Sequence, residues 1–122
     1  MLSIFKKKSA GSVDFSGLGS DMHSHLLPGI DDGSPDTDTS LRLIRGLQDL
    51  GYSRLVTTPH IMSDIYRNDR NSIAASHLQL QQVTPSIPAP IPLHAAAEYF
   101  LDDHFDKLLE NKIPLLTIKD NW

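Results

Sequence analysis

The chain has 122 residues, of which 39% are hydrophobic and 21% are charged, and this composition is typical of one small soluble domain. Because it contains no cysteine, thiolate catalysis and cysteine-ligated zinc are excluded, and any metal must be held by nitrogen and oxygen. The net charge of −4, with no basic stripe along the sequence, argues against nucleic acid as a partner.

Residues 1–20 are predicted to form a flexible leader, with room for a short first strand, ahead of a single domain over residues 21–122. A lysine run, Lys6 to Lys8, lies in this leader among glycine and serine residues, which is typical of a solvated tail. The leader lacks the apolar region of a signal peptide, and no apolar run approaches the roughly 18 residues of a membrane span. We therefore expect a cytoplasmic protein with no integral membrane segment.

From Asp21 onward, short apolar runs alternate with helical patterns, which is typical of β-α-β units and a largely parallel sheet. The expected strands are, in chain order, the stretch before His25 and residues 52–58, 93–100 and 115–118. The expected helices are, in chain order, one from about Asp36 to Gly51 and those over residues 71–83 and 102–109. The sequence therefore predicts an α/β fold, and we expect Tyr99 and Phe100 to pack in its core.

A pair of histidines stands in the first of these strands, within the stretch DMHSHLLPGIDDG (residues 21–33). Because side chains alternate between the two faces of a strand, His23 and His25 point the same way and can hold one ion. Two isolated histidines on their own favour a structural role. Their meaning therefore depends on which other groups the fold brings to them.

Three more potential ligands follow the ends of expected strands. Asp31 or Asp32 comes after the first strand, His60 follows the second, and Glu98 lies at the end of the third. In α/β barrels the carboxyl ends of the strands converge on one side, where catalytic groups are regularly found. The sequence therefore predicts a metal site built from these residues together with the two histidines.

Other polar residues have ordinary explanations. Asp36 is expected to start a helix rather than bind a metal. Tyr66 and Arg67 follow His60 in a predicted loop, where they could reach a substrate phosphate or simply lie at the surface. The remaining histidines are expected to have no ligand role: His77, His94 and His104.

The motifs DMHSHLLPGIDDG, TTPH and AAAEYF resemble the first three metal-site motifs of the polymerase-and-histidinol-phosphatase (PHP) superfamily. The combination of HSHLLPGIDDG with TPHIM is most similar to its bacterial tyrosine-protein phosphatase branch, which is linked to capsular and exopolysaccharide synthesis. The resemblance extends from about Asp14 to the end of the chain. It implies a distorted (β/α) barrel that holds a cluster of divalent ions, commonly manganese, with iron or zinc as alternatives.

The resemblance also implies a role for each matched residue. By this likeness His23 and His25 bind one ion, Glu98 bridges two ions, and Asp32 and His60 bind another. Asp31 is then either an additional ligand or a residue that contacts a ligand. The attacking group is expected to be a metal-bound water, so no side chain is predicted as the nucleophile.

A closed α/β barrel typically takes about 250 residues, so we expect these 122 residues to form the N-terminal portion of one. In this branch the second half carries a His-Pro-Glu-Arg motif, which this sequence lacks, and the arginines that hold the phosphate. Because a partial barrel leaves sheet edges open, we expect a homo-oligomer or a domain-swapped dimer.

The function that the resemblance implies is metal-dependent hydrolysis of phosphotyrosine on a protein, expected to be a bacterial tyrosine kinase. Two alternatives stay open. One is a small-molecule phosphoesterase of the same superfamily. The other is a catalytically incomplete fragment that retains metal binding or an assembly role.

Overall fold

The computed structural model describes residues 13–119, so the lysine run and most of the predicted leader lie outside the described residues. The strands are β1 (Ser20–Asp21), β2 (Arg54–Thr57), β3 (His60–Ile61), β4 (Leu93–Ala95) and β5 (Glu98–Tyr99). The helices are α1 (Thr37–Asp49), α2 (Arg70–Val83), the 3-10 turn η1 (Thr84–Ser86) and α3 (Asp103–Glu110). The predicted alternation of strands and helices is confirmed.

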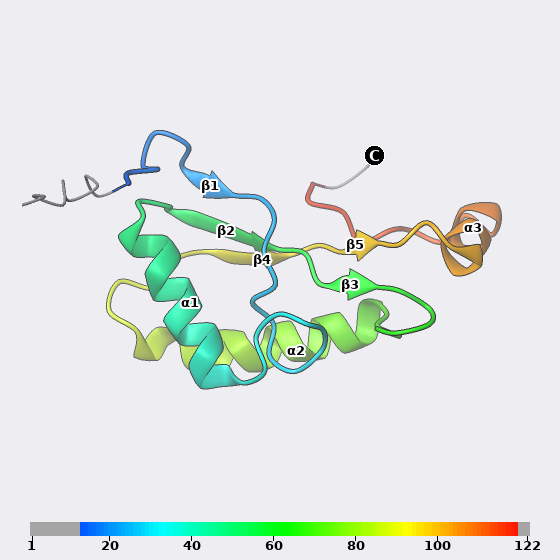
Figure 1. Ribbon diagram of the computed structural model, residues 1–122, viewed down its shortest axis with the longest axis horizontal. Helices are drawn as coiled ribbons and strands as arrows, with labels where there is room; N and C mark the ends of the chain where they lie inside the picture. The colour runs from blue at the N-terminus through cyan, green and yellow to red at the C-terminus, as the bar shows by residue number, and fades with distance from the viewer. Residues whose placement is uncertain (1–12, 120–122) are drawn as a thin grey trace, which may run out of the picture.

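All strand pairs of the two sheets are parallel. The larger sheet has the order β1-β2-β4, and β3 pairs with β5 in a second sheet. The two sheets follow one another along the molecule, since β2 is followed directly by β3 and β4 is followed directly by β5 (Figure 1). The predicted α/β class with parallel strands is therefore confirmed.

The hydrophobic core lies between the larger sheet and the helices α1 and α2, which cover the same face of it (Figure 1). Leu55 and Leu93 enter the core from neighbouring strands, Ile44 enters from α1, and Ile73 and Leu80 enter from α2. Burying a side chain of this size contributes about 1.5–3 kcal/mol. This packing holds the carboxyl ends of β1, β2 and β4 at one end of the molecule.

Side-chain caps fix where the helices begin. Asp36 accepts a hydrogen bond of 2.7 Å from the Thr39 amide at the start of α1, as the sequence predicts. Asp69 and Ser72 form a reciprocal capping box at the start of α2. Gly51 follows the last turn of α1 with a φ of +103°, a conformation that favours glycine.

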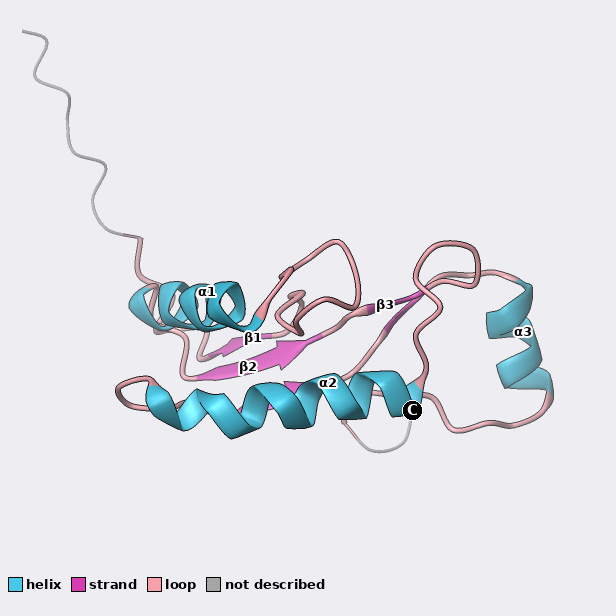
Figure 2. Ribbon diagram, turned by 90° about the horizontal axis from the view of Figure 1, so that it is seen from below, coloured by secondary structure: helices cyan, strands magenta, loops and turns pink. Residues whose placement is uncertain are grey.

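Helix α3 stands apart from α1 and α2, beyond β3 and β5 (Figures 1 and 2). It buries none of its residues. Asp102 caps its first turn by accepting a hydrogen bond of 2.9 Å from the Phe105 amide. The same carboxylate accepts from the amide and the hydroxyl of Ser63, so it ties α3 to the loop after β3.

Two sequence-based strand assignments are wrong in detail. The predicted strand 93–100 is two strands, because it is interrupted at Ala96 and Ala97. The predicted strand 115–118 does not form: Leu116 accepts from the Ala97 amide, but its own amide donates to the Tyr99 hydroxyl instead of to a neighbouring backbone. A single backbone contact does not make a ladder.

Two further expectations change on folding. The first strand ends at Asp21, two residues before His23, so the histidine pair follows the strand instead of lying in it. Phe100 is 53% exposed and does not pack in the core, whereas Tyr99 packs against the core as predicted. Within residues 13–119, no helix combines the length and the apolar character needed to cross a bilayer.

Candidate metal centre

The predicted ligands gather just beyond the carboxyl ends of the larger sheet. His23 and His25 follow β1, while His60 and Glu98 begin β3 and β5 after the ends of β2 and β4. The register of the β3–β5 pair sets His60 directly opposite Glu98. Parallel pairing thus brings together side chains that are far apart in the sequence.

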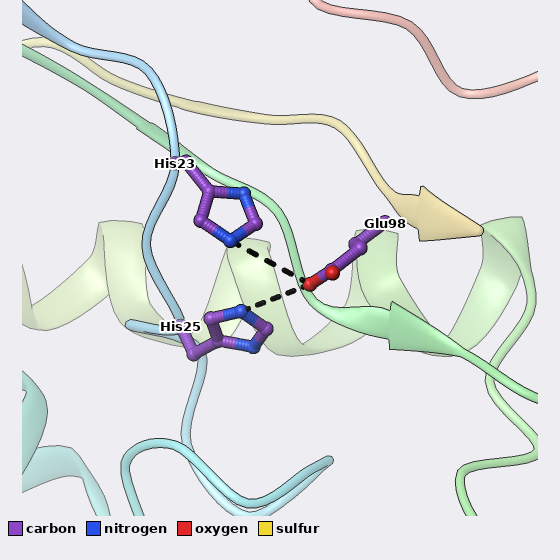
Figure 3. Close-up of side chains that lie close together, drawn as sticks. All are labelled: His23, His25 and Glu98. Carbon is purple, nitrogen blue, oxygen red and sulfur yellow. Dashed lines mark ion pairs between the residues drawn. The ribbon is translucent and has the colours of Figure 1, made fainter. Parts of the chain in front are cut away.

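One carboxylate oxygen lies at the centre of this group. Glu98 Oε2 is 3.2 Å from His25 Nε2, 3.3 Å from His60 Nδ1 and 3.7 Å from His23 Nε2. Figure 3 shows His23 and His25 pointing from one segment toward the Glu98 carboxylate. This oxygen is buried and has no hydrogen-bond partner among residues 13–119.

A second group overlaps the first. It consists of His25, Asp32 and His60, whose potential ligand atoms all lie within 4.8 Å of one another. Asp32 Oδ1 is 3.3 Å from His60 Nε2, and the His25 and His60 rings have centroids 4.6 Å apart. The structure therefore brings together all five residues of the predicted ligand set.

These residues fit a divalent metal ion. Imidazole nitrogen and carboxylate oxygen bind such an ion at about 2.0–2.2 Å, so ligand atoms 3–4 Å apart can share one. A buried carboxylate oxygen without a donor is costly unless a cation or a hydrogen bond compensates it, and Glu98 Oε2 is such an atom. A donor set of nitrogen and oxygen without sulfur suits manganese, iron or zinc.

Asp31 differs from its neighbour Asp32. The Asp31 side chain has no exposed area, and its oxygens contact His25 Nδ1 at 2.8 Å, the His60 amide at 3.0 Å and the Gly33 amide at 3.0 Å. Burial raises the pKa of Asp31, but these hydrogen bonds outweigh it and hold the pKa below its ordinary value. Asp31 belongs to neither candidate ligand group.

Several supporting residues were not predicted from the sequence. The Thr58 hydroxyl lies 2.9 Å from His23 Nδ1, on the side of that ring away from Glu98. The Asn68 amide group donates to the backbone carbonyls of Ile30 and His60, which holds the loop after β3 against the loop after β1. The only sequence signal for Thr58 is its place two residues before His60 in the TTPH motif.

The two residues of the predicted substrate loop have different surroundings. The Tyr66 ring stacks on the His60 ring, with centroids 5.5 Å apart and planes 11° apart. Arg67 is exposed and donates from Nε to the Ser63 carbonyl at 2.8 Å. Of the other histidines, His77 contacts the Leu93 carbonyl through Nε2, and neither His94 nor His104 belongs to a ligand group.

Comparison with known proteins gives a consistent match. Residues 19–121 match the family described as "Capsular polysaccharide synthesis, CpsB/CapC". The chain is 32% identical over 74 residues to the tyrosine-protein phosphatase YwqE of Bacillus subtilis (strain 168), covering 61% of this chain and 28% of that protein. It is 27% identical over 97 residues to the tyrosine-protein phosphatase CpsB of Streptococcus pneumoniae, covering 79% and 40%.

A solved structure has the same fold. It comes from work on crystal structures of YwqE from Bacillus subtilis and CpsB from Streptococcus pneumoniae, described as unique metal-dependent tyrosine phosphatases. The TM-score is 0.67 at 24% identity, and the match covers 76% of this chain and 38% of the solved chain. The chain thus spans less than half the length of these relatives.

Proposed function

The chain belongs to the CpsB/CapC family of capsular polysaccharide synthesis proteins, and on this basis we propose that it carries part of a metal-dependent protein-tyrosine phosphatase site. The observation that carries the proposal is the buried oxygen of Glu98, which faces three imidazole rings and has no hydrogen-bond partner within the described residues. The names of the matched relatives supply the reaction and the phosphotyrosine substrate.

The proposed ligands divide between two positions. His23 and His25 would hold one ion and Asp32 and His60 would hold another. Glu98 would lie between the two positions, because its Oε2 atom is 3.2–3.7 Å from a ring nitrogen of His23, His25 and His60. When bound, divalent ions supply Lewis acidity that activates water and offsets negative charge on the phosphoryl group. Tyr66 covers one face of His60, which restrains that imidazole ring. We propose manganese as the metal, with iron and zinc as alternatives.

The remaining parts of the proposal concern the whole protein. We propose that residues 21–122 contribute the N-terminal portion of a distorted PHP-type barrel, preceded by a leader. The arginines that hold the phosphate would come from the part of the family fold that this chain does not cover. The proposed setting is the cytoplasm, with a bacterial tyrosine kinase as the substrate protein and with self-association into a homo-oligomer or a domain-swapped dimer.

Phosphate release from a phosphotyrosine peptide in the presence of manganese tests this function. The assay compares the present chain with a version extended to the length of its relatives, each as wild type and as His23→Ala. His94→Ala is a matched control, because His94 is exposed and lies outside both ligand groups. We expect activity that chelation and His23→Ala abolish and that His94→Ala preserves.

Three outcomes would count against the proposal. Activity that survives both chelation and His23→Ala would exclude a metal-dependent mechanism at this site. Faster hydrolysis of histidinol phosphate or a sugar phosphate than of the peptide would favour a small-molecule phosphoesterase. Metal binding without turnover in either version would favour a catalytically incomplete protein.

A further inference from the structure

We propose that Asp31 is a positioning residue, which fixes the tautomer of His25 and aims its Nε2 atom at the proposed metal cluster. This inference rests on the proposed function, because it concerns the same site. It assigns to Asp31 a role different from that of Asp32, although the sequence offers the two carboxylates side by side.

Asp31 determines which nitrogen of His25 carries the proton. An ionised carboxylate can only accept hydrogen bonds, so the 2.8 Å contact between Asp31 Oδ2 and His25 Nδ1 requires the proton to be on Nδ1. A neutral imidazole carries one proton, and Nε2 is then left with a free lone pair. Only that form of His25 can bind a metal through Nε2.

The other ring nitrogen of His25, Nε2, faces the Glu98 carboxylate. His25 Nε2 lies 3.2 Å from Glu98 Oε2, yet this oxygen accepts no hydrogen bond within residues 13–119. A nitrogen lone pair and a carboxylate oxygen at this distance repel each other unless a cation lies between them. The hydrogen bond to Asp31 therefore prepares His25 for a cation instead of for Glu98 itself.

The contacts of Asp31 extend beyond His25. The same Oδ2 atom that meets His25 also accepts from the His60 amide, and Oδ1 accepts from the Gly33 amide. One buried carboxylate thus joins the loop after β1 to the start of β3. It sets the His25 and His60 rings at the separation that allows both to share a ligand group with Asp32.

These contacts also argue against Asp31 as a ligand. Both of its oxygens already accept from protein donors, and its side chain has no exposed area. Carboxylates that orient a metal-binding histidine in this way commonly change metal affinity by about 10–100-fold when they are replaced. The expected effect of losing Asp31 is of this size.

The test uses Asp31→Asn with Asp36→Asn as the matched control, since asparagine is as good a helix cap as aspartate. Nitrogen-15 NMR of the metal-free chain at about pH 8, where an ordinary imidazole is neutral, reports the tautomer of His25. We expect the Nδ1–H form in the wild type and in Asp36→Asn. Asp31→Asn has one acceptor oxygen fewer and no charge, so we expect the share of the Nδ1–H form to fall, together with manganese affinity that is about 10–100-fold weaker by calorimetry.

The outcomes separate this inference from the proposed function. An Nε2–H tautomer in the wild type would overturn the inference without any variant. Unchanged tautomer and affinity in a folded Asp31→Asn protein, combined with lost affinity in His23→Ala, would overturn it while the metal site stands. No manganese binding by the wild type would refute the metal site, and the NMR result would still decide the contact between Asp31 and His25.

Discussion

His60 and Glu98 lie opposite each other in the β3–β5 pair, with His60 Nδ1 3.3 Å from Glu98 Oε2. Two backbone hydrogen bonds hold this register, from the Glu98 amide to the Pro59 carbonyl at 2.9 Å and from the Phe100 amide to the Ile61 carbonyl at 3.0 Å. Backbone pairing therefore sets the relative position of the two candidate ligands.

The Glu98→Gln substitution should separate metal binding from folding. It keeps the shape of the side chain but removes the negative charge between three imidazoles, so we expect manganese affinity to fall at least about 10-fold. In chelator, the melting temperature should not fall, because the Glu98 oxygen that faces the histidines accepts no hydrogen bond within residues 13–119. Calorimetric titration and thermal melts measure the two effects, and unchanged affinity would contradict the assignment of Glu98.

Replacing Gly33 by alanine should damage both the fold and the site. A Cβ atom at Gly33 would overlap the Cβ and the carbonyl oxygen of His25, so the loop must shift. We expect a loss of about 1–3 kcal/mol in the free energy of unfolding, measured by urea denaturation in chelator. Gly46→Ala is the control: nothing lies within 4 Å of its added methyl group, and alanine within a helix should add about 0.5–1 kcal/mol. Equal stability of the two variants would argue against this close approach.

The contact between Asp102 and Ser63 should make the attachment of α3 depend on pH. The Ser63 amide and hydroxyl and the Phe105 amide lower the pKa of Asp102 from 3.8 to about 2. A lowered pKa means that the carboxylate stabilises the folded state above about pH 4, and that this contribution is lost as the pH falls toward about 2. The protection factor of the Ser63 amide compares its exchange rate with that of an unstructured peptide at the same pH. This protection factor should therefore fall across the interval.

Asp102→Asn provides the comparison for that measurement. Its amide group has no charge to titrate, so protection of the Ser63 amide should be low already at pH 5 and should not change further with acidification. Parallel pH profiles in the wild type and the variant would show that another group controls this contact.

The core should respond strongly at Leu80 and weakly at Leu78, although both lie in α2. Leu80 has no exposed area, whereas Leu78 is 57% exposed. Leu80→Ala should lower the free energy of unfolding by about 2–5 kcal/mol, and Leu78→Ala should change it by less than about 0.5 kcal/mol. Urea denaturation measures both, and similar values for the two variants would contradict the packing of α2 described above.

Local sequence patterns predicted most of the elements. The start of α1 at Asp36 is confirmed because an N-cap acts on amides within one turn. The resemblance to the capsule-linked tyrosine phosphatases is confirmed by the family match over residues 19–121. The convergence of His60 and Glu98 could also be anticipated, since parallel strands align their carboxyl ends.

The errors concern features that depend on partners distant in the sequence. Residues 115–118 have the apolar character of a strand, but a strand exists only where a neighbour completes its hydrogen bonds. The sequence alone could not show that Asp31 and Asp32 have different surroundings, because the two adjacent residues are of the same type. The difference follows from the turn at Gly33, which points one carboxylate inward to His25 and leaves the other more exposed.

The interruptions at Thr58–Pro59 and Ala96–Ala97 separate β2 from β3 and β4 from β5, and the second strand of each pair begins with a candidate ligand. Leu55 and Leu93 lie before these breaks, and His60 and Glu98 lie after them. Substitutions at His60 or Glu98 could therefore change the chemistry of this end of the sheet while the buried residues Leu55 and Leu93 stay the same.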